Sequence, residues 1–246
     1  MNTMTLPQTA AAARQSPSAR PAARGLGALL IADALLSFAP VVVLGAAIGW
    51  PASLGKPAAE QLAAVHANAD AVALGYGLYL LYSLLIAPVM IGLAARVFGG
   101  LDRPLPATVA AFAALSALAR AIGILRWLTV MPALAAAHTT ADPALRAQIE
   151  LLFSAVTTYG GGIGEVLGVS LLMAVSLATL CGGALWHGGL PKALAGTGLV
   201  VALALAALAL PAFGLPAAMP VAVAVTGMSL WMIATGVWCW RRSARV

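Results

Sequence analysis

Long apolar runs, separated by short segments with prolines, glycines and charges, divide the chain into six predicted helices. They cover residues 25–50, 71–98, 107–133, 162–186, 193–210 and 221–240. A helix rises about 1.5 Å per residue, so about 20 apolar residues cross a hydrocarbon core of about 30 Å. Membrane β-strands would instead alternate over about 10 residues, and residues 193–210 are apolar at nearly every position. The pattern predicts an all-α, polytopic transmembrane bundle of six helices.

Composition excludes a water-soluble globule. The 246 residues are 62% hydrophobic and 8% charged, whereas soluble domains have about 45–50% apolar and about 25% charged residues. Two cysteines are too few for a disulfide framework or a cysteine-rich metal site. The net charge of +6 comes without a clustered basic face or a recognition module, so we expect no nucleic-acid partner.

The basic residues predict the orientation. With six crossings, nine of them fall on one side of the membrane, and only Lys56 and Arg146 on the other. By the positive-inside rule, both the N- and C-termini are cytoplasmic. We therefore expect a flexible cytoplasmic tail over residues 1–24, a six-helix transmembrane domain over residues 25–240 and a basic cytoplasmic tail over residues 241–246.

The larger loops are expected on the outer face. Residues 134–161 contain a helix start, with Asp142 as N-cap and Pro143 in the first turn. Gly160, Gly161 and Gly162 are expected to break this helix from the next span. Without that break, the helix from Pro143 to Trp186 would be about 66 Å long, twice the thickness of the hydrocarbon core.

Four ionisable residues fall inside the predicted spans, namely Asp33, Arg120, Arg126 and Glu165. A charge at the bilayer centre costs about 2.5–3.5 kcal/mol on insertion scales. Two acids and two arginines sum to zero, which indicates mutual compensation. Their depths favour pairs of Asp33 with Arg120 and of Arg126 with Glu165, because arginine reaches far and forks onto a carboxylate.

Such a network predicts a binding site in the outer half of the bundle. Tyr79 and Thr129 lie at the depth of Arg126 and are candidates to line a pocket with it. The arginines suit a small anionic or amphiphilic ligand, and the chain is in contact with membrane lipid. The alternative interpretation is that the pairs only fix helix register.

Other chemistry finds little support in the sequence. The three histidines fall in connections, which disfavours a bis-histidine haem, and we expect no cofactor and no metal site. No H-E-x-x-H or G-x-S-x-G motif occurs, so no catalytic residue is predicted. Gly160, Gly164 and Gly168 are spaced by four, which favours close packing within the bundle and leaves a homodimer open.

At residues 119–127 (ARAIGILRW) and 186–196 (WHGGLPKALAG) the chain resembles a bacterial membrane-protein family, domain-of-unknown-function family 4386. The resemblance extends from the first predicted helix to the sixth. It implies a multi-pass protein of the bacterial inner membrane and transfers no activity or catalytic residue. It also suggests that Arg120 and Arg126 belong to a recurring pattern.

Three functions are compatible with these observations. The leading hypothesis is a membrane-embedded binding or transport protein with an internal charge network, and not an enzyme. The first alternative is a structural or regulatory membrane protein in which the network only fixes helix packing. The second alternative, a lipid- or isoprenoid-modifying enzyme, is disfavoured because the sequence has no Asp-rich metal motif and no nucleophile–base pairing.

Overall fold

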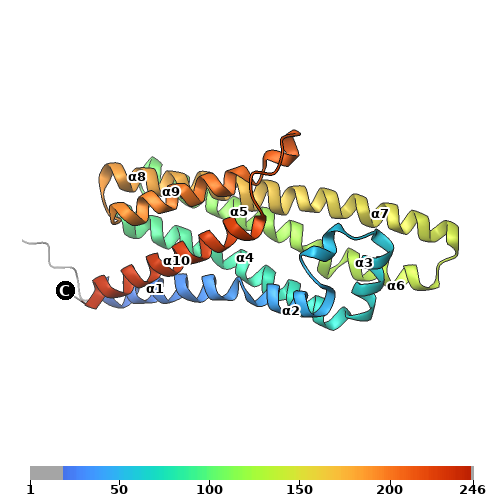
Figure 1. The fold of residues 1–246 in the computed structure, drawn as a ribbon. Coiled ribbons are helices and arrows are strands. Elements are labelled where there is room, and N and C mark those ends of the chain that lie inside the picture. Colours follow the sequence, from blue (N-terminus) through green and yellow to red (C-terminus); the bar gives the residue numbers. More distant parts are fainter. Residues whose placement is uncertain (1–18, 245–246) are drawn as a thin grey trace, which may run out of the picture.

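The computed structural model describes residues 19–244, in which every regular element is a helix (Figure 1). The α-helices are α1 (Ala19–Leu36), α2 (Ala39–Ile48), α3 (Ala58–Ala67), α4 (Ala69–Phe98), α5 (Pro104–Leu128), α6 (Val130–Thr140), α7 (Pro143–Gly161), α8 (Met173–His187), α9 (Lys192–Ala207) and α10 (Val221–Ala244). The 3₁₀ turns η1 (Ala52–Gly55) and η3 (Leu210–Phe213) and the π-helix η2 (Gly162–Leu172) complete the order. The all-α prediction is confirmed.

Five helical runs among the described residues are long and apolar enough to cross a membrane. They are Ala23–Ile48, Ala69–Phe98, Pro104–Thr140, Pro143–His187 and Val221–Arg242. The remaining apolar helix, α9, has 16 residues, or about 24 Å, and is shorter than a hydrocarbon core. The predicted span at residues 193–210 is therefore shorter than expected, because the chain leaves α9 at Leu208 and enters η3, which contains Pro211.

Both ends of the described chain lie at one end of the elongated bundle, which we call the terminal end (Figure 1). The α4–α5 and α8–α9 turns lie there too. Arg96 and Arg241 fall in the last turns of α4 and α10, and Lys192 begins α9. The opposite end, formed by α3, α6 and α7, is the cap end. The basic residues therefore gather at the terminal end, as the sequence predicted.

The predicted break at the three glycines is wrong. Gly161 and Gly162 have right-handed helical torsion angles (φ −62°, ψ −45° and φ −55°, ψ −44°), and the chain continues from α7 through η2 into α8. This run has 45 residues, about 68 Å by the helical rise. It extends beyond a hydrocarbon core, and α6 and α7 project together at the cap end (Figure 1).

The start of α7 agrees with the sequence. The Asp142 carboxylate accepts a hydrogen bond from the Leu145 amide at 2.9 Å, and Pro143 follows in the first turn. Of the predicted tails, residues 1–18 and 245–246 lie outside the described residues. Residues 19–24 already belong to α1, and residues 241–244 to α10.

Two groups of buried apolar side chains form separate cores. The terminal core is aliphatic and sulfur-rich, and its fully buried members include Leu30, Ile86, Met90, Leu93, Val109, Met173, Leu177 and Leu180. The cap core includes three buried aromatic residues, Tyr76, Trp127 and Phe153, together with Leu44, Leu62 and Met131, whereas the buried aromatic residue of the terminal core is Trp231. The candidate site lies beside the cap core.

Candidate ligand-binding pocket

A partly open pocket adjoins the cap core, between α4, α5, η2 and the connection that follows α2. It is lined by Trp50, Leu54, Tyr76, Tyr79, Arg120, Gly123, Ile124, Arg126, Trp127, Gly164, Glu165 and Val169. The volume available to water-sized molecules is about 30 Å³. A single water needs roughly 10–15 Å³ on this measure. The pocket thus has room for about two waters, or for one small group of a ligand.

Arg126 is half-buried on one wall of this pocket. Its Nη1 donates a hydrogen bond to the Gly123 carbonyl at 2.6 Å, and its Cζ lies 5.6 Å from the centre of the Trp127 ring. Its Nε has no hydrogen-bond partner. A Cβ at Gly160 would lie 2.5 Å from the Arg126 Cδ, so the glycine leaves the space that this side chain occupies.

Arg120 lies deeper, with 3% of its surface exposed. Its Nη1 donates to the Tyr82 hydroxyl at 3.2 Å, and its Cζ lies 5.7 Å from the centre of the Tyr82 ring. A Cβ at Gly168 would come within 3.0 Å of the Arg120 Cγ. The predicted role of the glycine spacing, close packing inside the bundle, is therefore visible at both arginines.

The two acids differ in their surroundings. Asp33 is fully buried (0% exposed), and neither carboxylate oxygen has a hydrogen-bond partner among the described residues. Its charge interacts with that of Arg120. Glu165 is exposed on the rim of the pocket, and its charge interacts with that of Arg126.

Neither predicted pair forms a direct ion pair. The ion pairs of the described residues, with nitrogen and oxygen within 4.0 Å, are Lys56–Glu60 and His138–Glu150. Helical depth placed each acid near its arginine, but it did not fix the rotation of each helix. The Arg120 guanidinium donates to Tyr82 and the Arg126 guanidinium donates to Gly123. Both arginines also line the pocket.

Aromatic side chains form much of the remaining wall. Tyr76 and Trp127 stack with ring centres 4.8 Å apart and planes 3° apart, and Trp127 meets Phe153 edge-on at 6.0 Å. Trp50 meets Tyr79 edge-on at 6.0 Å. Neither Trp50 nor Trp127 was predicted to line the pocket.

Tyr79 lines the pocket, as predicted, and Tyr82 lies next to it with ring centres 6.0 Å apart. Tyr82 was not among the residues predicted to lie at the site. The spacing of three residues from Tyr76 to Tyr79 and on to Tyr82 places the rings on one helix face, and this is the signal that would have found it. Thr129 is exposed instead, does not line the pocket, and its hydroxyl donates to the Leu125 carbonyl at 2.7 Å.

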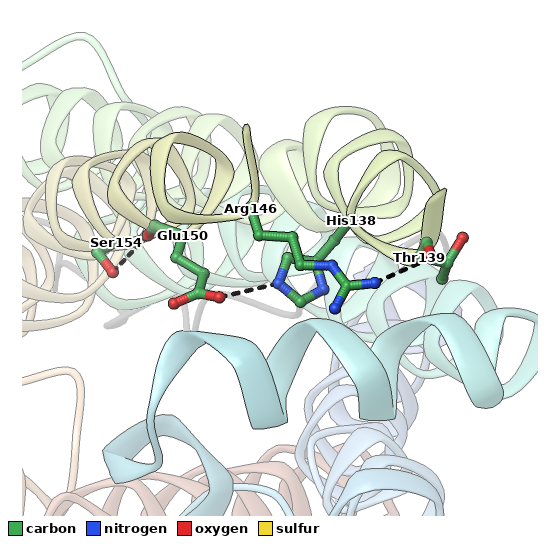
Figure 2. A network of polar contacts seen from close by, with 5 residues as sticks. All are labelled: His138, Thr139, Arg146, Glu150 and Ser154. Atoms are coloured by element: carbon green, nitrogen blue, oxygen red, sulfur yellow. Dashed lines mark hydrogen bonds and ion pairs between the residues drawn. The ribbon is translucent and has the colours of Figure 1, made fainter. Parts of the chain in front are cut away.

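A second polar cluster lies in the cap, where α6 and α7 run side by side (Figure 2). The His138 Nε2 and Glu150 Oε1 atoms are 2.9 Å apart, and the Arg146 Nη2 donates to the Thr139 carbonyl at 3.4 Å. None of these residues lines the pocket. Across residues 19–244, no group of three or more His, Cys, Asp or Glu side chains is placed to hold a metal ion.

The five apolar helical runs and the charged pocket between them define a polytopic helical membrane protein. Comparison with protein families gives the narrower assignment. The chain belongs to the family described as Domain of unknown function (DUF4386), whose model matches residues 26–236. The resemblance noted in the sequence is thereby confirmed. Neither the curated proteins nor the solved structures contain a match.

Proposed function

We propose that this protein is a membrane-embedded binding or transport protein whose site is the pocket lined by Arg120, Arg126 and Glu165. The ligand is a small anion or the anionic group of an amphiphile. One observation supports this most directly: two arginines face the same small cavity, and the Nε atom of each is buried without a hydrogen-bond partner. The Nε atoms themselves are enclosed, so an anion in the cavity would be stabilised by the charge of the two guanidinium groups that line it.

The proposal includes a topology. We place both termini in the cytoplasm and the cap end outside, in the inner membrane of a bacterium, because the basic residues gather at the terminal end. The short helix α9 packs on α8 and α10 and serves as the sixth crossing. An even number of crossings keeps the described ends of the chain on one side, in agreement with their common position (Figure 1).

A purely structural role for the arginines is the second candidate. It is favoured by the fit of the Arg126 stem against Gly160 and of the Arg120 stem against Gly168. Buried charges of this kind fix the register of neighbouring helices in some proteins. The two candidates differ in one measurable respect, since only the first requires that an anion binds.

Iodide tests the proposal, because it is a monoanion that also quenches tryptophan fluorescence, and Trp50 and Trp127 line the pocket. With the purified protein in nanodiscs, we expect a saturable component of iodide quenching that is lost in Arg126→Gln. Arg146→Gln is the matched control, because Arg146 is exposed in the cap and does not line the pocket. Acrylamide, a neutral quencher, should show no saturation.

The source of the anionic group is resolved by ligand-induced stabilisation, since a ligand that binds only the folded state raises the unfolding temperature. Acetate, inorganic phosphate and decanoate are compared on the same sample. Stabilisation by acetate or phosphate indicates a small anion, and stabilisation by decanoate alone indicates an amphiphile. No saturable quenching by iodide and no stabilisation by any of the three would leave the structural role as the better account.

A further inference from the structure

Arg120 belongs to two environments at once. On one side it lines the pocket, and on the other it is the positive charge that acts on the buried carboxylate of Asp33. The Asp33 oxygens receive no hydrogen bond from the described residues. Arg120 is therefore the main group that stabilises an ionised Asp33, and anything that draws the Arg120 charge toward the pocket weakens that stabilisation.

The charges of this region balance without a ligand. Asp33 and Glu165 contribute two negative charges, and Arg120 and Arg126 contribute two positive charges. A bound monoanion would leave one uncompensated negative charge in a medium of low dielectric, where charges interact strongly. One proton restores neutrality.

We propose that Asp33 takes up one proton when a monoanion binds at Arg120 and Arg126, so that the protein binds an anion and a proton together. This inference rests on the proposed anion site. The proton comes from solvent and forms one O–H bond on the Asp33 carboxylate, and no other bond is made or broken. Linkage then requires that the affinity for the anion rises as the pH falls, by up to tenfold per pH unit for one proton.

Asp33 is a better proton acceptor in this state than the other groups nearby. Glu165 is exposed on the rim of the pocket, whereas Asp33 is fully enclosed, so an uncompensated charge is more costly at Asp33. Across from Asp33, α5 offers Arg120, and α4 offers Tyr82, whose hydroxyl accepts from Arg120. Helix α2 has no titratable side chain, and those of the described part of α10 are Cys239, Arg241 and Arg242 in its last turns.

Proton uptake is measured directly with a pH-indicator dye in weakly buffered detergent solution, on adding potassium iodide to the protein. Iodide does not take up protons itself. We expect alkalinisation of up to one proton per bound iodide, lost in Asp33→Asn and retained in Asp142→Asn, which removes an exposed carboxylate of the cap that does not line the pocket. Difference infrared spectra of the unaltered protein give a second measurement, in which the carbonyl stretch of a newly protonated carboxyl appears on adding iodide. It tests the proposal even if Asp33→Asn fails to fold.

The outcomes separate the two proposals. Saturable iodide binding without proton uptake, or uptake that persists in Asp33→Asn, overturns the coupling and leaves the anion site intact. Absence of saturable iodide binding overturns the anion site, and the coupling with it. Binding accompanied by uptake that is lost only in the Asp33 variant supports both.

Discussion

The terminal core and the pocket region differ in the buried polar groups that they contain. In the terminal core, small hydroxyls bridge helices: the Ser176 hydroxyl donates to the Val109 carbonyl at 2.9 Å, and Ser37 and Ser229 share a hydrogen bond of 2.9 Å. Near the pocket, charged groups are buried: the Arg120 Nε and both Asp33 carboxylate oxygens have no partner among the described residues. The hydroxyl of Thr235, between the terminal-core residues Trp231 and Cys239 of α10, also has no partner among the described residues, but it is uncharged. Buried polar groups that are hydrogen-bonded favour one packing arrangement of the core. Buried charged groups without hydrogen bonds lower stability, and we take them as an indication of a binding role. The contrast separates the packed half of the molecule from the half that we assign to binding.

The largest effect is expected when Arg120 is removed. Arg120→Gln removes the positive charge that acts on the fully buried Asp33. Because the two side chains form no direct ion pair, we expect a loss of about 2–3 kcal/mol, below the cost of about 3–5 kcal/mol for breaking a buried ion pair. Arg126→Gln should cost only about 1 kcal/mol, the value of a typical hydrogen bond, because Arg126 is half-buried and its neighbour Glu165 is exposed. The free energy of unfolding in mixed micelles measures both.

A double-mutant cycle isolates the cause of that difference. Asp33→Asn combined with Arg120→Gln should recover most of the stability that Arg120→Gln loses, because the uncompensated charge is then absent. Equal losses for the two arginine variants, or no recovery in the double variant, would contradict the distinction between a deep and a peripheral arginine.

In the packed half, helix contact tests the comparison. A Cβ at Gly27 would lie 2.7 Å from the Gly236 carbonyl oxygen, whereas a Cβ at Gly25 would meet no atom within 4 Å. Gly27→Ala should therefore destabilise the α1–α10 contact by about 1–3 kcal/mol, the usual cost of overpacking. Gly25→Ala on the same helix should be neutral or stabilise by up to about 1 kcal/mol through helix propensity. A thermal unfolding series measures both, and similar values would show that this contact is not tightly packed.

The parts of the fold that depend only on neighbouring residues were predictable from the sequence. Run length and hydropathy gave the long helices, because crossing a bilayer depends only on consecutive apolar residues. The predicted helix break at Gly160–Gly162 was wrong, because a glycine accepts helical or turn torsion angles equally well. There the Arg126 side chain of α5 packs against Gly160, and a contact from another helix is not visible in the local sequence.

The site was predicted in part for the same reason. Depth along each helix placed Tyr79, Arg126 and Glu165 at comparable levels and Arg120 deeper, and all four line one pocket. Depth along a helix does not say how the helix is rotated about its axis. The prediction of direct ion pairs was therefore wrong, although the residues lie at suitable depths. Thr129 was wrongly predicted to line the pocket, because its side chain points elsewhere. It lies at the α5–α6 break, and its hydroxyl donates to the backbone carbonyl of Leu125.

In the cap, the predicted N-cap at Asp142 is present in the structure. A smaller loss of stability is expected when this N-cap is removed. Asp142→Ala removes the carboxylate that accepts the Leu145 amide, and loss of an N-cap costs about 0.5–2 kcal/mol. The effect should be confined to the first turn of α7 and appear as faster amide hydrogen exchange there. Asp142→Asn keeps a capping oxygen and should exchange like the unaltered protein, and fast exchange in both variants would show that the cap contributes little.

The smallest effect is expected for the His138–Glu150 pair, which joins α6 to α7 in the cap (Figure 2). Both side chains are partly exposed, at 14% and 36%, and pairs of this kind contribute about 0.2–1 kcal/mol. The coupling energy from a cycle of His138→Ala and Glu150→Ala should lie in this range. The same cycle should leave iodide quenching of the pocket tryptophans unchanged, since neither residue lines the pocket. A change in quenching would mean that the cap and the pocket are energetically coupled, and the pocket could then no longer be treated as separate from the helices that project beyond it.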